Sequence, residues 1–201
     1  MINIINYGLN NIFSIKNCLD KINVNSKIID TPQDFKEGNK IILPGVGSFK
    51  IAMNRLKKNH WDEFLKNYLT NKNNYLLGIC LGMQLLASKS SEDGKSEGLN
   101  LVNCEVKKLS DMNCNERLPH VGWNSLKFVN NCSIFKNIPD NLDFYFVHNY
   151  IMTNNKYVVG EFEYGLKFTA AIQNNNIFGV QFHPEKSADA GKIILKNFND
   201  L

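Results

Sequence analysis

The sequence has 201 residues, a formal net charge of +4 and 43% hydrophobic residues, which fits a single globular domain over residues 1–201. Its weak positive charge comes without a dense run of Lys and Arg or an aromatic and basic ladder, so nucleic-acid binding is not indicated. No apolar run approaches the roughly 20 residues of a membrane helix, so no membrane contact is expected.

The N-terminal segment has neither a cationic region nor a long apolar region, so we expect no signal peptide. The cysteines are odd in number and include no C-x-x-C pair, which indicates neither a disulfide framework nor a zinc site; they are Cys18, Cys80, Cys104, Cys114 and Cys132. This usage fits a reducing cytoplasm. Nothing in the sequence suggests a metal or an organic cofactor.

Strand-like and helix-like runs alternate through the first half of the chain. Short apolar runs predict strands, and runs with apolar residues spaced three and four apart predict helices. The expected order is strand 2–5, helix 10–22, strand 26–30, strand 40–45, a helix in two pieces over 49–69, strand 74–79 and a helix beginning at 80–87. This alternation is typical of a mostly parallel α/β sheet flanked by helices.

After residue 88 the pattern changes to a polar loop over 90–98 and then to a series of strand-like runs. These runs predict an antiparallel β extension packed on the first half, with a closing helix over 189–201; they cover 103–109, 123–129, 143–151, 157–164, 167–173 and 177–183. No internal repeat or linker indicates a second domain.

The segment GICLGMQ places Cys80 between Gly78 and Gly82, where an apolar strand is expected to become a helix. A strand, a sharp turn and a helix with this Gly-x-Cys-x-Gly spacing is typical of a nucleophile elbow. The turn would expose the sulfur at the carboxyl edge of the sheet, and the N-terminus of the following helix would favour a thiolate. The alternative is a small buried cysteine of an α/β core.

The segment FHPEKS offers a base for this thiol at the end of another apolar strand. His183 follows the strand, Pro184 stops it, and Glu185 can reach back to the imidazole. A thiolate enzyme needs such a base and a group that orients it. A strand-end histidine beside a surface glutamate is the alternative. The other candidate histidines are His60, His120 and His148, of which His60 is expected to be exposed at a helix junction.

Together these segments resemble the class I glutamine amidotransferase family, in which an elbow cysteine and a His and Glu pair occur in this order. Six segments also resemble the glutaminase (HisH-type) subunits of imidazole glycerol phosphate synthase, which acts in histidine biosynthesis: NYGLNNIFS, LPGVGSF, GICLGMQLL, LPHVGWN, YFVHNY and FGVQFHPEKS. PHVGWN and YFVH carry this narrower resemblance. It implies a flavodoxin-like fold that hydrolyses glutamine to glutamate and ammonia.

The resemblance implies roles for the residues that match these motifs. Cys80 would be the nucleophile that forms a γ-glutamyl thioester. His183 would be the general base and then the general acid, and Glu185 would orient it. The main chain would form the oxyanion hole at Leu81, Gly45, Val46 and Gly47.

Further roles concern the substrate and the activation of the enzyme. In this family the PGVG peptide swings into place only when the partner is loaded. Gln84 and Glu92 match the positions that hold the polar groups of glutamine, and a carboxylate suits its ammonium group. A solvated loop residue is the alternative for Glu92.

The resemblance also implies a partner, a cyclase subunit with a (β/α)8 barrel that forms a heterodimer with the glutaminase and receives its ammonia. Trp123, Tyr145 and Lys186 would lie near this interface. Packing in the core is the alternative for the two aromatic residues.

Two positions depart from the usual family pattern: Asn6 stands where Asp is common, and Asn10 where Gly is common. Asn tolerates left-handed backbone angles, so Asn10 is compatible with the loop. This loop lies near the docking face, which leaves open a paralogue that supplies ammonia for amidino groups on bacterial surface sugars. A stand-alone cysteine hydrolase and a non-catalytic binding subunit are further alternatives.

Overall fold

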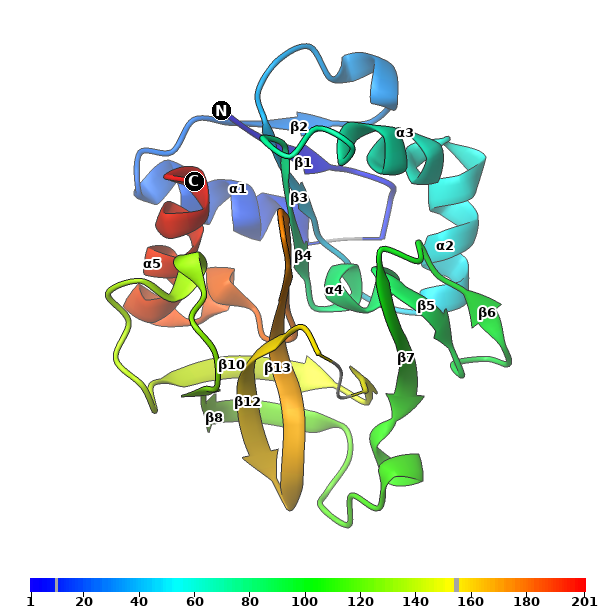
Figure 1. Ribbon diagram of the computed structural model, residues 1–201, viewed down its shortest axis with the longest axis vertical. Coiled ribbons are helices and arrows are strands. Elements are labelled where there is room, and N and C mark those ends of the chain that lie inside the picture. Colours follow the sequence, from blue (N-terminus) through cyan, green and yellow to red (C-terminus); the bar gives the residue numbers. More distant parts are fainter. Residues whose placement is uncertain (10, 154–155) are drawn as a thin grey trace.

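A computed structural model describes residues 1–9, 11–153 and 156–201, so the expectation for Asn10 lies outside the described residues. The centre is an eight-stranded sheet in the order β2-β1-β3-β4-β14-β13-β12-β9 (Figure 1). Its first five strands are parallel neighbours: β2 (Ser26–Ile29), β1 (Ile2–Ile5), β3 (Lys40–Leu43), β4 (Tyr75–Ile79) and β14 (Ile177–Val180).

The remaining three strands extend the sheet in antiparallel fashion: β13 (Leu166–Asn174), β12 (Val158–Tyr164) and β9 (Lys127–Phe128). The predicted fold class, a mostly parallel sheet flanked by helices with an antiparallel extension, is therefore confirmed. The parallel half places β14 directly beside β4, with Val180 opposite Ile79. This pairing brings the ends of the two strands that carry the predicted nucleophile and base to the same edge of the sheet.

Helices cover both faces of the parallel half (Figure 1). One hydrophobic core contains residues of α1 (Ile12–Lys21) and α5 (Ala188–Asn199), and the other contains residues of α2 (Phe49–Lys58) and α3 (Trp61–Tyr68). Along β3, Ile42 joins the first core, whereas Ile41 and Leu43 join the second. This alternation explains the nearly continuous apolar strands, because both of their faces are buried.

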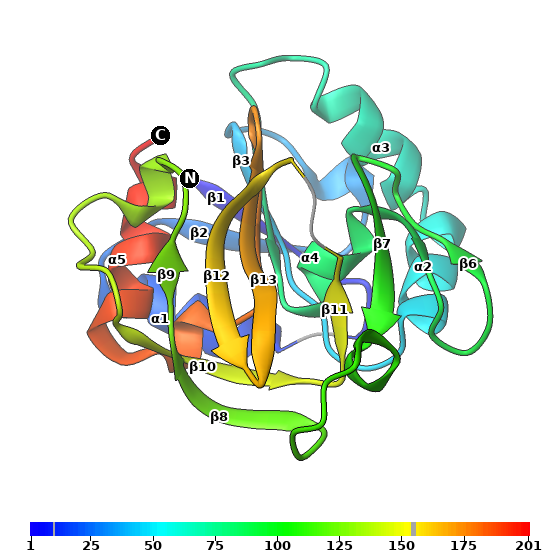
Figure 2. The same ribbon diagram turned by 60° about the horizontal axis from the view of Figure 1, so that its bottom comes forward.

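Two smaller sheets are attached to the main one. The first has the order β11-β7-β5-β6, and the second pairs β10 with β8. Figure 2 shows β8 and β10 side by side, running across the direction of β12 and β13. The bounds are β5 (Ala87–Ser90), β6 (Ser96–Glu97), β7 (Val102–Lys108), β8 (His120–Ser125), β10 (Asp143–His148) and β11 (Tyr150–Met152).

Several expected elements differ from the structure. The expected loop 90–98 contains the short strand β6 (Ser96–Glu97), and the expected strand 177–183 ends at Val180. The helix expected to begin at 80–87 is α4 (Leu81–Leu85), because the chain from Ala87 onward pairs with β7 as β5. The expected strand 123–129 is divided between β8 and β9 at the buried residue Leu126. The expected strand 143–151 is divided at Asn149, so β10 and β11 belong to different sheets.

Short 3-10 helices complete the described chain at Pro32–Asp34, Leu109–Met112, Ser133–Phe135 and Pro184–Lys186. The expected division of the 49–69 helix is confirmed, with His60 in a left-handed conformation between α2 and α3 and exposed as predicted. Within the three described segments, no helix has the length and apolar character needed to cross a membrane.

Candidate active site

A cavity of about 420 Å³ opens at the carboxyl edge of the parallel strands, beside the start of α4. Its walls come from segments far apart in the sequence: Val46, Gly47, Cys80, Leu81, Gln84, Glu92, Val147, His148, Asn149, Tyr150 and His183. Most of the predicted catalytic, oxyanion and substrate-binding residues therefore gather around one cavity. This edge is where α/β sheets generally bind their ligands.

Cys80 occupies a strained turn between β4 and α4. Its backbone angles are φ 54° and ψ −112°, in a region that residues with a side chain rarely adopt. The residue is only 7% exposed, so solvent reaches its sulfur through the cavity rather than at an open surface. The elbow predicted from the sequence is present. Its helix has only five residues, so we assign the helix dipole little influence on the sulfur.

The two glycines around Cys80 are required by close backbone approaches. A Cβ at Gly78 would lie 2.7 Å from the carbonyl oxygen of Gly82, and a Cβ at Gly82 would overlap the carbonyl oxygen of Leu43 in β3. The turn can therefore close on itself only if Gly78 lacks a side chain, and it can pack against β3 only if Gly82 does.

We expect Gly82→Ala to lower the free energy of unfolding by about 3 kcal/mol, because the obstructing backbone atom cannot move without shifting β3. Urea unfolding would measure the change. Gly160→Ala in β12 is the control, since a Cβ there would meet only side-chain carbons, the nearest at 3.4 Å. Equal unfolding midpoints for the two variants would contradict this account of the turn.

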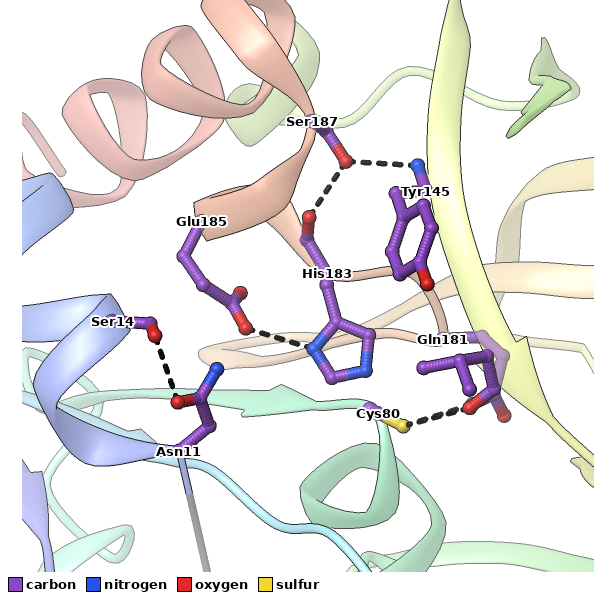
Figure 3. Close-up of polar contacts among 9 residues, drawn as sticks. Asn11, Ser14, Cys80, Tyr145, Gln181, His183, Glu185 and Ser187 are labelled. Carbon is purple, nitrogen blue, oxygen red and sulfur yellow. Dashed lines mark hydrogen bonds and ion pairs between the residues drawn. The ribbon is translucent and has the colours of Figure 1, made fainter. Parts of the chain in front are cut away.

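His183 and Glu185 form an oriented pair beside Cys80 (Figure 3). The Nδ1 atom of His183 lies 2.8 Å from Oε1 of Glu185, and both side chains are almost completely buried. The Nε2 atom of His183 is buried and has no hydrogen-bond partner. Burial disfavours the imidazolium, but the nearby Cys80 and Glu185 favour it more strongly and raise the pKa of His183. Glu185 is therefore not the surface residue of the alternative interpretation.

Two contacts of the Cys80 sulfur were not predicted from the sequence. Nε2 of Gln181 lies 3.7 Å from Sγ, and the thiol can donate to the carbonyl oxygen of Val147 at 3.9 Å. Gln181 follows directly after β14 and stands two residues before His183, the candidate base. A glutamine inside the apolar run FGVQFH was the available signal.

Two further histidines form a neutral pair next to the cavity. Nδ1 of His148 lies 3.0 Å from the carbonyl oxygen of Tyr150, and its Nε2 lies 3.0 Å from Nδ1 of His120. A carbonyl only accepts, so Nδ1 of His148 carries a proton and Nε2 accepts from His120. Burial lowers the pKa of His120 to about 4 and that of His148 to about 3. Both ring nitrogens of His148, the member of the pair that lines the cavity, are therefore engaged.

The predicted oxyanion segment lies against the cavity in one particular orientation. The Val46 N–H donates to the carbonyl oxygen of Leu9 at 3.1 Å, so this donor is already engaged. Val46 and Gly47 line the cavity, whereas Gly45 is packed between the side chains of Tyr7 and Leu81. The Leu81 N–H begins α4 and is not used inside that helix.

The two predicted substrate-binding residues, Gln84 and Glu92, both line the cavity. Nε2 of Gln84 donates to the carbonyl oxygen of Tyr150 at 2.8 Å and to Oε1 of Gln181 at 2.9 Å. Oε2 of Glu92 accepts the Phe49 N–H at 2.8 Å, at the start of α2. Partial burial raises the pKa of Glu92 against this hydrogen bond. Glu92 is thus anchored rather than a freely solvated loop residue.

The three residues predicted near a partner surface lie together. The rings of Trp123 and Tyr145 have centroids 6.0 Å apart, and Nζ of Lys186 lies 5.6 Å from the Tyr145 ring centroid. Trp123 is 53% exposed, which argues against a role in core packing. The carbonyl oxygen of Tyr145 accepts the His183 N–H at 2.9 Å, so this cluster adjoins the candidate base.

The departure at Asn6 is accommodated locally. Its Oδ1 accepts the Gly8 N–H at 3.1 Å, as an aspartate oxygen could, and its Nδ2 donates to Oδ1 of Asp30 at 2.7 Å. The turn at the first loop is therefore kept.

No group of three or more His, Cys, Asp or Glu side chains able to hold a metal occurs among residues 1–9, 11–153 and 156–201.

Known proteins similar to this chain agree with one another. The sequence model of the family described as glutamine amidotransferase class-I matches residues 3–200. The chain is 42% identical to the imidazole glycerol phosphate synthase subunit HisH of Moorella thermoacetica, over 98% of this chain and 93% of that protein. It is 40% identical to subunit HisH 1 of Campylobacter jejuni strain 81-176, over the full length of both.

Solved structures support the same fold at lower sequence identity. The structure of PurLQS from Thermotoga maritima is matched with a TM-score of 0.73 and 16% identity, over 99% of this chain and 97% of that chain. At this identity the likeness concerns the fold alone.

Proposed function

We propose a function on the premise that this chain belongs to the class I glutamine amidotransferase family, and within it to the HisH subunits. It is the glutaminase subunit of imidazole glycerol phosphate synthase and acts in histidine biosynthesis. It hydrolyses glutamine to glutamate and ammonia, and the ammonia is used by a cyclase partner.

The observation that carries this proposal is the arrangement of His183. Its Nδ1 is fixed by Glu185 at 2.8 Å, and its unpartnered Nε2 is on the side of Cys80 (Figure 3). A base held in one orientation with a vacant acceptor nitrogen is what a thiol nucleophile requires. The proton on Nδ1 is held by the carboxylate, so Nε2 is the nitrogen that receives the thiol proton.

The reaction then has two halves. The Cys80 thiol gives its proton to Nε2 of His183, and the sulfur attacks the side-chain amide carbon of glutamine. The tetrahedral intermediate collapses to a γ-glutamyl thioester when His183 returns the proton to the leaving ammonia. Water, activated by His183, next attacks the thioester and releases glutamate with the free thiol. Gln84 and Glu92 hold the substrate, with the Glu92 carboxylate facing the ammonium group.

The negative oxygen of each tetrahedral intermediate needs fixed donors. We assign the Leu81 N–H as one donor and the Val46 N–H as the other. Val46 is tied to Leu9 in the conformation described, so its peptide must rotate before the second donor is available. We therefore expect the isolated subunit to have low activity and the loaded partner to activate it.

Ammonia formed in the cavity would be lost to solvent without a covering partner. We assign the docking of a (β/α)8 cyclase to the surface that carries Trp123, Tyr145 and Lys186, next to His183. Val121 is 55% exposed and shares β8 with the 53% exposed Trp123, so this surface offers apolar area for an interface.

Trp123→Ala is expected to weaken the complex with the cyclase by about tenfold or more, since exposed aromatic residues commonly dominate such interfaces. Titration calorimetry with the cyclase would measure the dissociation constant. Leu166→Ala, at a 45% exposed apolar residue of β13 outside this cluster, is the control and should bind as the unaltered chain does. An unchanged dissociation constant for the Trp123 variant would move the docking surface elsewhere.

Glutamate release from glutamine tests the function. It would be measured for this chain alone, with the histidine-pathway cyclase of the same organism, and with cyclase plus its nucleotide intermediate. A low rate alone that rises sharply with the loaded cyclase supports both the glutaminase and its partner. If the chain hydrolyses glutamine but the cyclase does not stimulate it, the alternative acceptor of ammonia is favoured. That acceptor is an enzyme that makes amidino groups on surface sugars.

A further inference from the structure

Gln181 is a completely buried polar side chain next to the reacting sulfur. It follows directly after β14, and its main-chain N–H is bonded to the carbonyl oxygen of Ala170 at 2.8 Å. Burying an amide is unfavourable unless its hydrogen-bonding atoms find partners. The partners of this amide therefore indicate why a glutamine occupies an apolar strand end.

The hydrogen bonds around Gln181 determine which way its amide points. The carbonyl oxygen of Tyr150 only accepts, so the atom of Gln84 that meets it at 2.8 Å is the nitrogen. The second hydrogen on that nitrogen needs an acceptor, which is Oε1 of Gln181 at 2.9 Å. The remaining polar atom of the Gln181 amide, the Nε2 donor, is thereby directed at Sγ of Cys80, 3.7 Å away.

The two unpredicted contacts of the sulfur act differently when the thiol ionises. The Val147 carbonyl can accept the S–H proton of the neutral thiol, but it offers nothing to a thiolate. The N–H of Gln181 can donate to the sulfur in both states, and a hydrogen bond to a charged partner is roughly twice as strong as a neutral one. When the proton moves from Sγ to Nε2 of His183, the Gln181 bond gains strength and the Val147 bond is lost.

We propose that Gln181 is a further catalytic residue of this glutaminase, whose side-chain N–H stabilises the Cys80 thiolate while its side-chain oxygen holds Gln84 in place. This inference rests on the proposed function, because it names another participant in the same reaction. It also links nucleophile and substrate site through one amide: a shift of Gln84 on glutamine binding reaches the sulfur through two hydrogen bonds.

Gln181→Met tests the proposal, because it removes both polar groups and keeps the length and apolar volume of the side chain. The rate of Cys80 alkylation by iodoacetamide would be followed from pH 5 to pH 10 by mass spectrometry of the Cys80 peptide. We expect the pH of half-maximal alkylation to rise by about one unit, and kcat of the cyclase complex to fall by about tenfold. The matched control is Gln173→Met in β13, away from the cavity, which should change neither quantity.

Gln181→Glu is the second variant, in case the methionine variant folds poorly. It keeps the size and the acceptor for Gln84 but places a carboxylate oxygen where the donor was, so the alkylation midpoint should rise further. A purely structural role would leave the alkylation profile of both variants unchanged, and that result would overturn the inference. The proposed function fails separately, if the unaltered chain in the loaded complex hydrolyses no glutamine.

Discussion

Cys80→Ala is expected to abolish glutamine hydrolysis completely while the assembled enzyme still uses added ammonium at its normal rate. Alanine has no group that can form a thioester, so the first half of the reaction has no substitute route. In the proposed complex the cyclase keeps its own active site, and ammonia is all that it needs from the glutaminase. Both rates would be measured on the same purified complex, with glutamine and then with ammonium chloride as the nitrogen source.

The matched control is Cys104→Ala in β7, which removes another buried free thiol from a strand that does not line the cavity. It should retain glutamine-dependent activity. If the Cys80 variant still consumed glutamine at the normal rate, the nucleophile would have to be a different residue. Loss of the ammonium-dependent rate as well would mean that the substitution disturbs the complex rather than the chemistry.

The parts of the site that could be predicted are those encoded by local sequence. The elbow follows from Gly-x-Cys-x-Gly after an apolar strand, because the turn itself requires those glycines at Gly78 and Gly82. The pairing of His183 with Glu185 needs only a two-residue reach across Pro184. Gly78 and Gly82, like His183 and Glu185, meet within a few residues of the chain, so spacing carries this part of the geometry. The approach of Gly82 to Leu43 of β3 is a contact between distant segments, which spacing does not give.

The parts that could not be predicted depend on contacts between distant segments. Gln181 reaches Cys80 because β14 lies beside β4, a pairing that no local pattern specifies. His120 meets His148 only through the register of β8 with β10. The early end of α4 has the same origin, since pairing of β5 with β7 overrides the helical pattern that continues past Leu85.

The orientation of the peptide proposed for the oxyanion hole also depends on a contact between distant segments. The Val46 N–H is held by Leu9, 37 positions earlier in the chain, and a PGVG sequence is compatible with either orientation of its peptides. The resemblance suggested that this peptide moves. In the proposed mechanism, the hydrogen bond from Val46 to Leu9 is the contact that has to break. It lies at the first loop, where Asn6 keeps the turn through its bond with Gly8.

His183→Asn is expected to lower kcat of the loaded complex by on the order of 10⁴-fold. Asparagine can fill part of the imidazole volume, but it cannot take the thiol proton or return it to ammonia. Glutamate release by the complex, measured with saturating glutamine, would give the value. His60→Asn is the matched control, because His60 is exposed between α2 and α3 in a left-handed conformation that asparagine tolerates well.

The pH dependence of the remaining activity separates loss of the base from loss of the fold. Cys80 and Glu185 raise the pKa of His183 despite its burial. In the unaltered site, the proton exchanged between Cys80 and His183 therefore stays on these two side chains across neutral pH. Without His183, hydroxide must remove the thiol proton, and the residual rate should keep rising into the alkaline range. A loss below tenfold would place the base elsewhere in the cavity. His148 is poorly suited to replace it, because its two ring nitrogens are already engaged by Tyr150 and His120.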